Sequence, residues 1–144
     1  MITFAINYGG LKGGQRLPED RIKRLLRATQ RLSHVEGRQE ISIAFVTAHA
    51  MKRLNEAYYG GHGVTDVLAF PSEGIEEARG YLGEILIYYP RAEKQAKEHG
   101  TTARAEVELL LVHGLLHLLG YNHETVQKKD VMFRLQDRIL AASH

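Results

Sequence analysis

The chain has 144 residues, and its composition excludes several classes of protein before any motif is considered. Hydrophobic residues make up 44% and charged residues 25% of the chain, a balance typical of folded domains and unlike that of disordered chains. The chain has no cysteine, so disulfide bonds and thiolate metal sites are excluded, and histidine and carboxylate groups must hold any metal ion. The net charge of +2 demands no particular partner. We expect one domain that spans residues 1–144.

In chain order, the first half of the sequence predicts two strands and two helices. Residues 2–8 alternate apolar and polar side chains, which is typical of a half-buried strand. Residues 18–37 begin with proline and two acidic residues, keep apolar residues at helical spacing and end at a glycine, so they predict a helix. Residues 40–46 are rich in β-branched residues and predict a second strand. Thr47 should cap a helix that runs to about Tyr59.

The second half of the sequence predicts two further strands and three further helices. The strands are expected at 65–71 and 81–89, with a polar loop over residues 72–80 between them. The three helices are expected at about 90–99, from a cap at Thr101 or Thr102 to about 119, and at about 124–142. Four strands and about five helices without a repeat predict an α+β fold with one mixed sheet.

Nothing in the sequence indicates export or membrane insertion. The opening stretch, MITFAINYGG, lacks the basic leader and apolar core of a signal peptide. The densest apolar run, residues 109–119, is too short to span a membrane and contains two histidines. We therefore expect a cytoplasmic protein that does not insert into a membrane.

Three histidines near the end of the predicted helix 102–119 have the spacing of metal ligands. His113 and His117 are four residues apart, so they lie on one helix face with Cβ atoms about 5–6 Å apart. Two imidazole nitrogens at that separation can reach one ion at about 2.0–2.1 Å. Gly120 allows the chain to turn and bring His123 towards the same ion. Three imidazoles leave a fourth position open for water, which is typical of a catalytic site.

Each of these rings, taken alone, has a simpler interpretation as a hydrogen-bonded core residue. The two helical rings, however, sit among leucines 115, 116, 118 and 119, and burying both without a shared partner is unfavourable. The pattern therefore favours one metal ion per chain. Zinc suits three imidazoles, although other first-row divalent ions such as nickel, cobalt or copper would also bind. The remaining histidines are expected to be ordinary surface residues, at positions 34, 49, 62, 99 and 144.

Gly114, directly after the first predicted ligand, argues against a peptidase. Zinc peptidases with an HExxH motif carry a glutamate here, which takes a proton from the metal-bound water. Glycine has no side chain that could do so. A metal ion still lowers the pKa of its bound water towards about 7. An RNA substrate would also bring its own nucleophile, the 2′-hydroxyl, so the site favours phosphodiester chemistry.

A second feature is the basic stretch RIKRLLRATQR, residues 21–31, which carries five basic residues and no acidic one. A basic helix face can follow a phosphate backbone, which makes Arg24, Arg27 and Arg31 candidate RNA contacts. Taken alone, however, the stretch is better explained as an ordinary solvated helix face.

Three segments of the chain, taken in order, resemble one known family. HGLLHLLGYNH (113–123) resembles the H-G-x-L-H-L-x-G-Y-D-H signature of the YbeY-type endoribonuclease and rRNA maturation family. LNEAYYGGHGVTDVLAFP (54–71) and LGEILIYYPRAEKQAKEHG (82–100) resemble two further segments of that family. The resemblance spans nearly the whole chain.

The resemblance implies a single zincin-like α+β domain and a metal-dependent hydrolase that cuts single-stranded RNA. It also implies a role in 16S rRNA 3′-end maturation and ribosome quality control, with the small ribosomal subunit or assembly factors as partners. The segment 65–71 would be a strand that lines the cleft, with Thr65 and Asp66 at its mouth. The family's three zinc ligands carry over to His113, His117 and His123, on the long fourth helix and the turn after it.

The chain departs from the family pattern at three positions. Tyr59 stands where the family has an arginine that is regarded as catalytic or phosphate-binding, and a phenol cannot offer a cationic fork to a phosphate. Arg53, earlier on the same predicted helix, is a poorly aligned substitute. Asn122 and Glu84 each replace a family aspartate, and the second change is the milder one.

Three functions remain open at the level of sequence. The first is a metal-dependent endoribonuclease that acts on rRNA. The second is a ribosome-assembly or RNA-binding factor with a mainly structural metal and weak or lost catalysis, which Tyr59 favours. The third is a zinc peptidase, which Gly114 disfavours.

Overall fold

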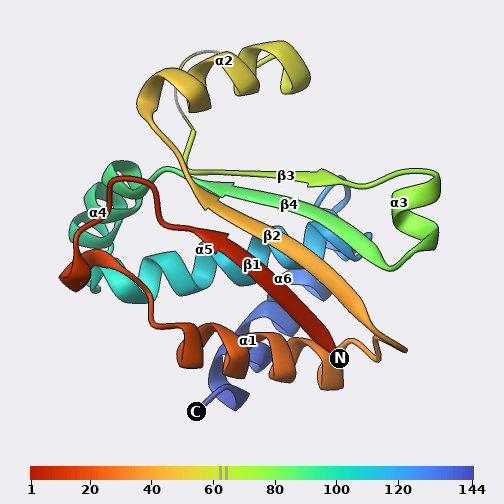
Figure 1. The fold of residues 1–144 in the computed structure, drawn as a ribbon. Coiled ribbons are helices and arrows are strands. Elements are labelled where there is room, and N and C mark those ends of the chain that lie inside the picture. The colour runs from red at the N-terminus through yellow and green to blue at the C-terminus, as the bar shows by residue number, and fades with distance from the viewer. Residues whose placement is uncertain (62, 64) are drawn as a thin grey trace.

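The computed structural model describes residues 1–61, 63 and 65–144, and it has the mixed four-stranded sheet that the sequence predicts. β1, β2 and β4 run parallel, and β3 pairs antiparallel with β4. The order across the sheet is β1-β2-β4-β3, so β1 and β3 are the edge strands (Figure 1). The strands are β1 (Ile2–Asn7), β2 (Gln39–Phe45), β3 (Val67–Pro71) and β4 (Tyr81–Ile87).

The described part of the chain contains six α-helices, one more than the sequence predicts. They are α1 (Glu19–Leu32), α2 (Ala48–Tyr59), α3 (Ile75–Ala78), α4 (Tyr89–Glu98), α5 (Ala103–Leu118) and α6 (Val126–Ala142). The prediction of a polar loop over residues 72–80 was wrong in part, because α3 lies within it. The N–H of Ala78 donates to the carbonyl of Gly74 at 3.0 Å. A helix of this length is held by a few local hydrogen bonds. It has too few residues for a periodic apolar pattern, so the sequence does not reveal it.

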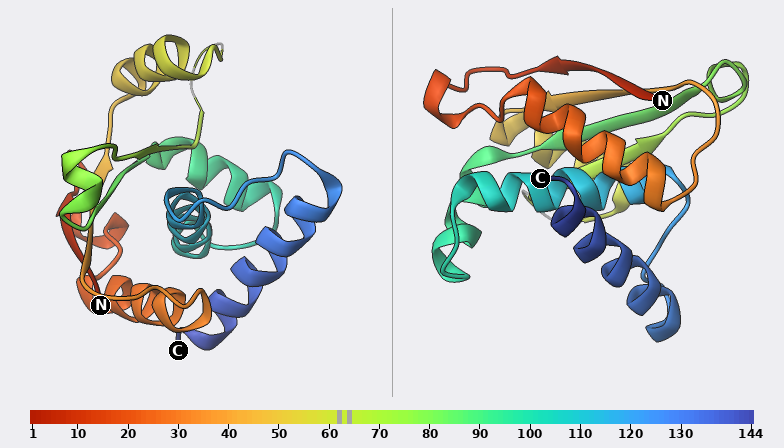
Figure 2. Two further views of the ribbon diagram at one scale, coloured as in Figure 1. Left: turned by 90° about the vertical axis from the view of Figure 1, so that its right-hand side faces the viewer. Right: turned by 90° about the horizontal axis from the view of Figure 1, so that it is seen from below.

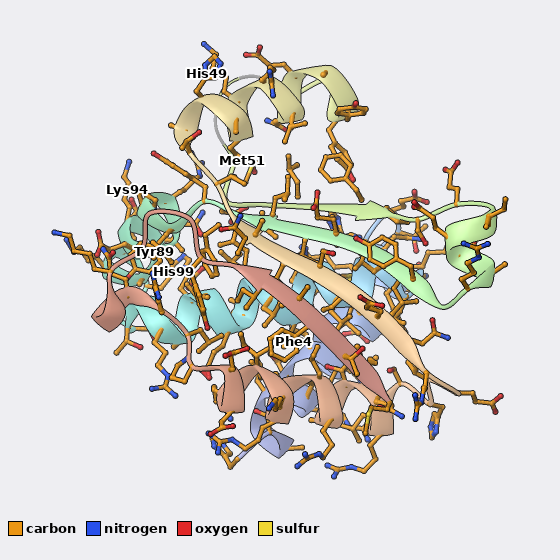
Figure 3. All side chains as sticks on the ribbon, in the orientation of Figure 1. Phe4, His49, Met51, Tyr89, Lys94 and His99 are labelled. Atoms are coloured by element: carbon orange, nitrogen blue, oxygen red, sulfur yellow. The ribbon has the colours of Figure 1, made fainter. Side chains whose placement is uncertain are left out.

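Four helices lie on one side of the sheet, where α5 and α1 pack against the strands while α4 and α6 pack against α5, and α2 covers part of the other face (Figure 1). α5 lies at the centre of the four, where Figure 2 shows it almost end-on, with the sheet, α1, α4 and α6 around it. The main core forms here, with Ile85 of β4 and Leu111 and Leu115 of α5 among its fully buried residues. On the opposite face, Met51 of α2 points towards the sheet and packs with Leu86 (Figure 3).

Gly114 lets α5 lie close to β4. A Cβ atom at this position would be 2.9 Å from Cγ2 of Ile85. Carbon atoms that are not bonded prefer separations of about 3.5–4.0 Å, so any larger residue here would push the helix and the strand apart. The close approach of α5 to β4 therefore favours glycine at position 114, and glycine has no side chain that could take a proton from a metal-bound water.

The ends of α5 have the signals that the sequence predicts. The hydroxyl of Thr102 accepts a hydrogen bond from the N–H of Ala105 at 3.1 Å and caps the start of the helix. Beyond the other end, Gly120 has a φ of 98°, a left-handed conformation that favours glycine. The chain changes direction there, which places His123 just past the helix.

None of the described helices is long and apolar enough to cross a membrane.

Candidate metal centre

The structure brings the three predicted ligands together at the end of α5. His113 and His117 project from successive turns of the helix, and His123 comes from the segment after Gly120. One nitrogen atom from each ring can be chosen so that all three atoms lie within 4.8 Å of one another. His113 and His117 are half-buried and His123 is exposed, so the cluster is open on one side. Of the other histidines, four are exposed or partly exposed as expected, 34, 49, 99 and 144, and His62 lies outside the described residues.

The geometry of this cluster fits a shared metal ion. The Nε2 atoms of His113 and His117 are 3.2 Å apart. Two nitrogens that each lie about 2.0–2.1 Å from one tetrahedral ion are about 3.3–3.4 Å from each other. The ring centroid of His123 is 5.4 Å from that of His117, close enough for its side chain to supply a third nitrogen. The residues present therefore fit an ion with three imidazole ligands and one open position.

Gln136 of α6 orients the ring of His113. Its side-chain oxygen Oε1 lies 3.0 Å from Nδ1 of His113, and Gln136 is only 7% exposed. An amide oxygen can only accept, so Nδ1 carries the proton and Nε2 keeps its lone pair for a metal. No local pattern in the sequence marks this contact, because Gln136 is 23 residues away and reaches His113 only through the packing of α6 on α5.

Burial favours the neutral form of the two histidines on α5. It lowers the pKa of His113; the hydrogen bond with Gln136 opposes this shift, the nearby His123 adds to it, and the charge of Asp66 opposes it. Burial also lowers the pKa of His117, and the neighbouring His113 and His123 lower it further. A neutral imidazole has a free lone pair, so at neutral pH no proton has to leave these rings before a metal binds.

A cleft of about 500 Å³ opens beside the histidines. Its walls come from α2, β3, α5 and the segment after α5. Among the described residues that line it, two are carboxylates, Asp66 and Glu124, and none is lysine or arginine. The cleft is therefore negatively charged apart from the histidines.

Asp66 lines the cleft, and Thr65 donates a hydrogen bond to it. Oδ1 of Asp66 accepts hydrogen bonds from the N–H of Val67 at 2.8 Å and from the hydroxyl of Thr65 at 3.3 Å. β3 begins only at Val67, so both residues belong to the loop before the strand. The family resemblance implies that both side chains lie at the mouth of the cleft; Asp66 is among the described lining residues, whereas Thr65 is not.

Tyr59 stands at the cleft, and Arg53 does not. Tyr59 is 53% exposed at the end of α2, and its hydroxyl donates to the carbonyl oxygen of Ala69 on β3. Its ring centroid lies 5.6 Å from that of Phe70. Arg53 is exposed on α2 and is not among the described lining residues. Within the described lining, no arginine takes the place of the one that the family resemblance leads us to expect at position 59.

α6 adds an aromatic side chain to the rim of the site. The ring centroid of Phe133 lies 6.0 Å from that of His113 and 6.4 Å from that of His123. The ring is 37% exposed, and Nζ of Lys129 is 5.4 Å from its centroid. An accessible ring beside a cation is a typical surface for stacking a base and contacting a phosphate. Sequence reasoning missed Phe133, since in the sequence it is one apolar residue of an amphipathic helix.

The basic stretch 21–31 lies on α1, away from the cleft. Arg24, Arg27 and Arg31 are not among the described residues that line the cleft. Arg21 is buried instead, where it pairs with Glu108 of α5 and donates to the backbone carbonyl beyond α6. RNA contact by the other three arginines stays a prediction.

Comparison with known proteins identifies relatives of this chain. Residues 14–144 match the family model described as Endoribonuclease YbeY. An Endoribonuclease YbeY of Geobacillus thermodenitrificans is 38% identical over 130 residues, which cover 83% of this chain and 82% of the relative. That of Micrococcus luteus is 35% identical over 147 residues, which cover 98% and 91% of the two chains. A solution structure of a Thermotoga maritima protein matches with a TM-score of 0.66 and 28% identity, over 99% of this chain and 89% of that one.

Proposed function

The chain belongs to the endoribonuclease YbeY family, and from this premise we propose that it is a metal-dependent hydrolase that cuts single-stranded RNA. The observation that supports this most is the three-histidine cluster beside an open cleft, with Gly114 where a peptidase would need its glutamate. We further propose that the substrate is the 3′ end of precursor 16S rRNA in the cytoplasm, and that cleavage serves ribosome quality control. The partners would be the small ribosomal subunit or its assembly factors.

The proposed ion is zinc or another first-row divalent metal, held by His113, His117 and His123. When bound, such an ion polarises a phosphoryl oxygen and lowers the pKa of a coordinated water. The residues of the chain supply the setting for this chemistry. Gln136 holds the ring of His113 in one orientation, and burial favours the neutral form of the two histidines on α5.

The charge of the cleft indicates that RNA and metal bind together. Asp66 and Glu124 repel a phosphate, and no lysine or arginine among the described lining residues offsets them. A divalent ion at the histidines would cancel the charge of these two carboxylates and give a phosphate a cation to bind. We therefore expect the metal-free protein to bind single-stranded RNA in this cleft more weakly than the metal-loaded protein does.

The second candidate function is an RNA-binding assembly factor in which the metal is mainly structural. Tyr59 favours it, because no arginine replaces the phenol in the described lining of the cleft. A peptidase remains disfavoured. A glutamate at position 114 would have to displace Ile85 before it could reach a metal-bound water.

Cleavage of a fluorescent single-stranded RNA by the zinc-loaded protein tests the proposal. We expect cleavage that a chelator abolishes and added metal restores, and none of a matched duplex. His117→Ala should lose both metal and cleavage, whereas His49→Ala, an exposed histidine that points away from the sheet (Figure 3), should keep both. RNA binding without any cleavage would favour the assembly factor, and chelator-sensitive hydrolysis of casein would favour the peptidase.

A further inference from the structure

A second hollow, larger than the cleft, lies between α1 and the edge strand β1. It encloses about 570 Å³, compared with about 500 Å³ for the cleft beside the histidines. One wall is the start of β1 and includes Ile2 and Phe4; the other is the outer face of α1 and includes Lys23, Arg27 and Arg31. Figure 3 shows Phe4 between β1 and α1. We call this hollow the α1–β1 groove.

β1 presents unpaired backbone groups to its open side. Backbone groups of successive residues in a strand point to opposite sides. The N–H of Gln39 in β2 donates to the carbonyl of Met1 at 2.8 Å, so the odd-numbered residues of β1 pair with β2. The even-numbered residues therefore direct their N–H and C=O groups outward. Those of Phe4 and Ile6 have no hydrogen-bond partner among the described residues.

This edge lacks the usual protection against strand pairing. Proteins usually prevent pairing at an exposed edge strand by placing lysine, proline or a β-bulge there. The sequence of β1, ITFAIN, contains no charged residue and no proline, and its register with β2 is continuous. The side chain of Gln30 accepts a hydrogen bond from the N–H of Ile2 at 2.9 Å, but this covers only one end. By contrast, β3 ends in Pro71 and receives the hydroxyl of Tyr59.

The far wall of the groove carries an excess of positive charge. Lys23, Arg27 and Arg31 follow at intervals of four residues and form one stripe along α1. The only acidic residue among the described lining is Glu19. None of the three cations forms an ion pair with a described residue. A strand added to β1 would direct alternate side chains towards this stripe.

We propose that the α1–β1 groove binds an extended acidic segment of a partner protein, which adds to β1 as a fifth strand. The backbone of the segment pairs with Phe4 and Ile6, and its carboxylates meet Lys23, Arg27 and Arg31. RNA fits less well, because a nucleic acid cannot continue the ladder of N–H and C=O groups. A second copy of this chain also fits less well, because its β1 has no acidic residue to meet the cations.

A short fluorescein-labelled peptide that alternates glutamate and threonine tests this proposal on the full, metal-loaded chain. We expect saturable binding that salt weakens, with shifts of the backbone amide NMR signals of Phe4 and Ile6. Arg27→Glu combined with Arg31→Glu should weaken binding by about tenfold or more. The matched control is Arg24→Glu, which reverses a charge on α1 outside the described groove lining and should change binding by less than about twofold.

Two further measurements separate strand addition from attraction of charge alone. The same peptide, N-methylated at every residue, has no N–H group left to donate to β1 and should not bind. Equal binding of the methylated peptide, or no saturable binding of the parent peptide, would overturn the proposal. It would equally be overturned if a single-stranded RNA displaced the peptide through the same two arginines, or if sedimentation showed that the chain pairs with itself through β1.

Discussion

At the scale of single residues, Gln136 is expected to set how tightly the site binds metal although it is not a ligand. Gln136→Leu leaves Nδ1 of His113 buried without an acceptor and frees the ring to turn. Loss of such a supporting hydrogen bond typically weakens metal affinity by about 10- to 100-fold. Zinc competition against a chromophoric chelator measures the effect. Gln136→Glu keeps an acceptor oxygen in place and should retain most of the affinity; unchanged affinity in Gln136→Leu would contradict this role.

Tyr59 is the residue on which the rate of RNA cleavage should depend most visibly. If an arginine here stabilises charge on the phosphate, Tyr59→Arg should raise cleavage by roughly 10²–10³-fold, the usual value of one transition-state donor. Metal content should not change. The comparison is made by single-turnover cleavage of the same labelled RNA.

Tyr59→Phe is the matched control for this substitution. It removes the hydrogen bond to Ala69 but keeps the ring. Any change in its cleavage rate therefore measures the effect of losing this contact between α2 and β3. If Tyr59 instead stacks on a base, Tyr59→Arg should weaken RNA binding and slow cleavage, and Arg53→Ala should be the more damaging variant.

The clustering of the three histidines was predictable from the sequence, whereas the contacts of Gln136 and Phe133 with them were not, because these two residues lie farther along the chain. His113 and His117 are related by one helical turn, and Gly120 supplies the turn that brings His123 back, so local geometry was sufficient. Gln136 and Phe133 reach the site through the angle at which α6 packs on α5, which no local pattern encodes.

At the scale of elements, strands and helix starts were predicted well because each has a local cause. Alternating burial marked β1, and threonine hydroxyls fixed the starts of α2 and α5. α3 escaped prediction because a helix of four residues has no periodic face. The charged face of α1 was also only partly predictable. Arg21 looked like its neighbours in the sequence, but it is buried against Glu108.

The contact between α5 and β4 gives the prediction at this scale. Gly114→Ala gains about 1 kcal/mol of helix propensity, but the new Cβ meets Ile85 and overpacking costs about 1–3 kcal/mol. We therefore expect the free energy of unfolding to fall by roughly 1 kcal/mol, measured by urea denaturation. Gly14→Ala, where no atom lies within 4 Å of the added Cβ, should change it by less than about 0.5 kcal/mol.

A double-mutant cycle identifies the cause of that loss. Ile85→Ala alone should cost about 2–5 kcal/mol, because it empties a fully buried position. It also makes room for the Cβ that Gly114→Ala adds, so the double variant should cost less than the sum of the two single variants. Strict additivity would mean that the two positions do not contact each other in the way the structure shows.

At the scale of the whole molecule, the two hollows lie against opposite edges of the sheet. The cleft uses β3 and the α1–β1 groove uses β1, with β2 and β4 between them. A substrate in the cleft and a partner strand in the groove would therefore not compete for the same backbone groups. The core around α5 joins the two sites, because this helix carries two of the three histidines and contacts α1.

The stability of the whole molecule should depend on pH through His113 and His117. Burial lowers the pKa of both rings from the usual 6.5. As the pH falls, the unfolded chain therefore takes up protons at these positions at a higher pH than the folded chain does. The free energy of unfolding of the metal-free protein should thus be steady above about pH 6.5 and fall as the pH drops from there towards the folded-state pKa values. Bound zinc raises the free energy of unfolding by RT ln(1 + [M]/Kd), where [M] is the free zinc concentration and Kd the dissociation constant of the site. This contribution should also become smaller at low pH, because protons compete with zinc for the imidazole nitrogens.

Urea unfolding between about pH 8 and pH 5, with and without zinc, measures both effects. The variant that combines His113→Ala and His117→Ala should lose the stabilisation by zinc at every pH, together with the part of the pH dependence that comes from these rings. His99→Ala removes an exposed histidine outside the cluster and should keep the stabilisation by zinc. If zinc stabilised the wild-type protein as strongly at pH 5 as at pH 8, neutral imidazoles could not be its main ligands, and the metal would have to bind elsewhere.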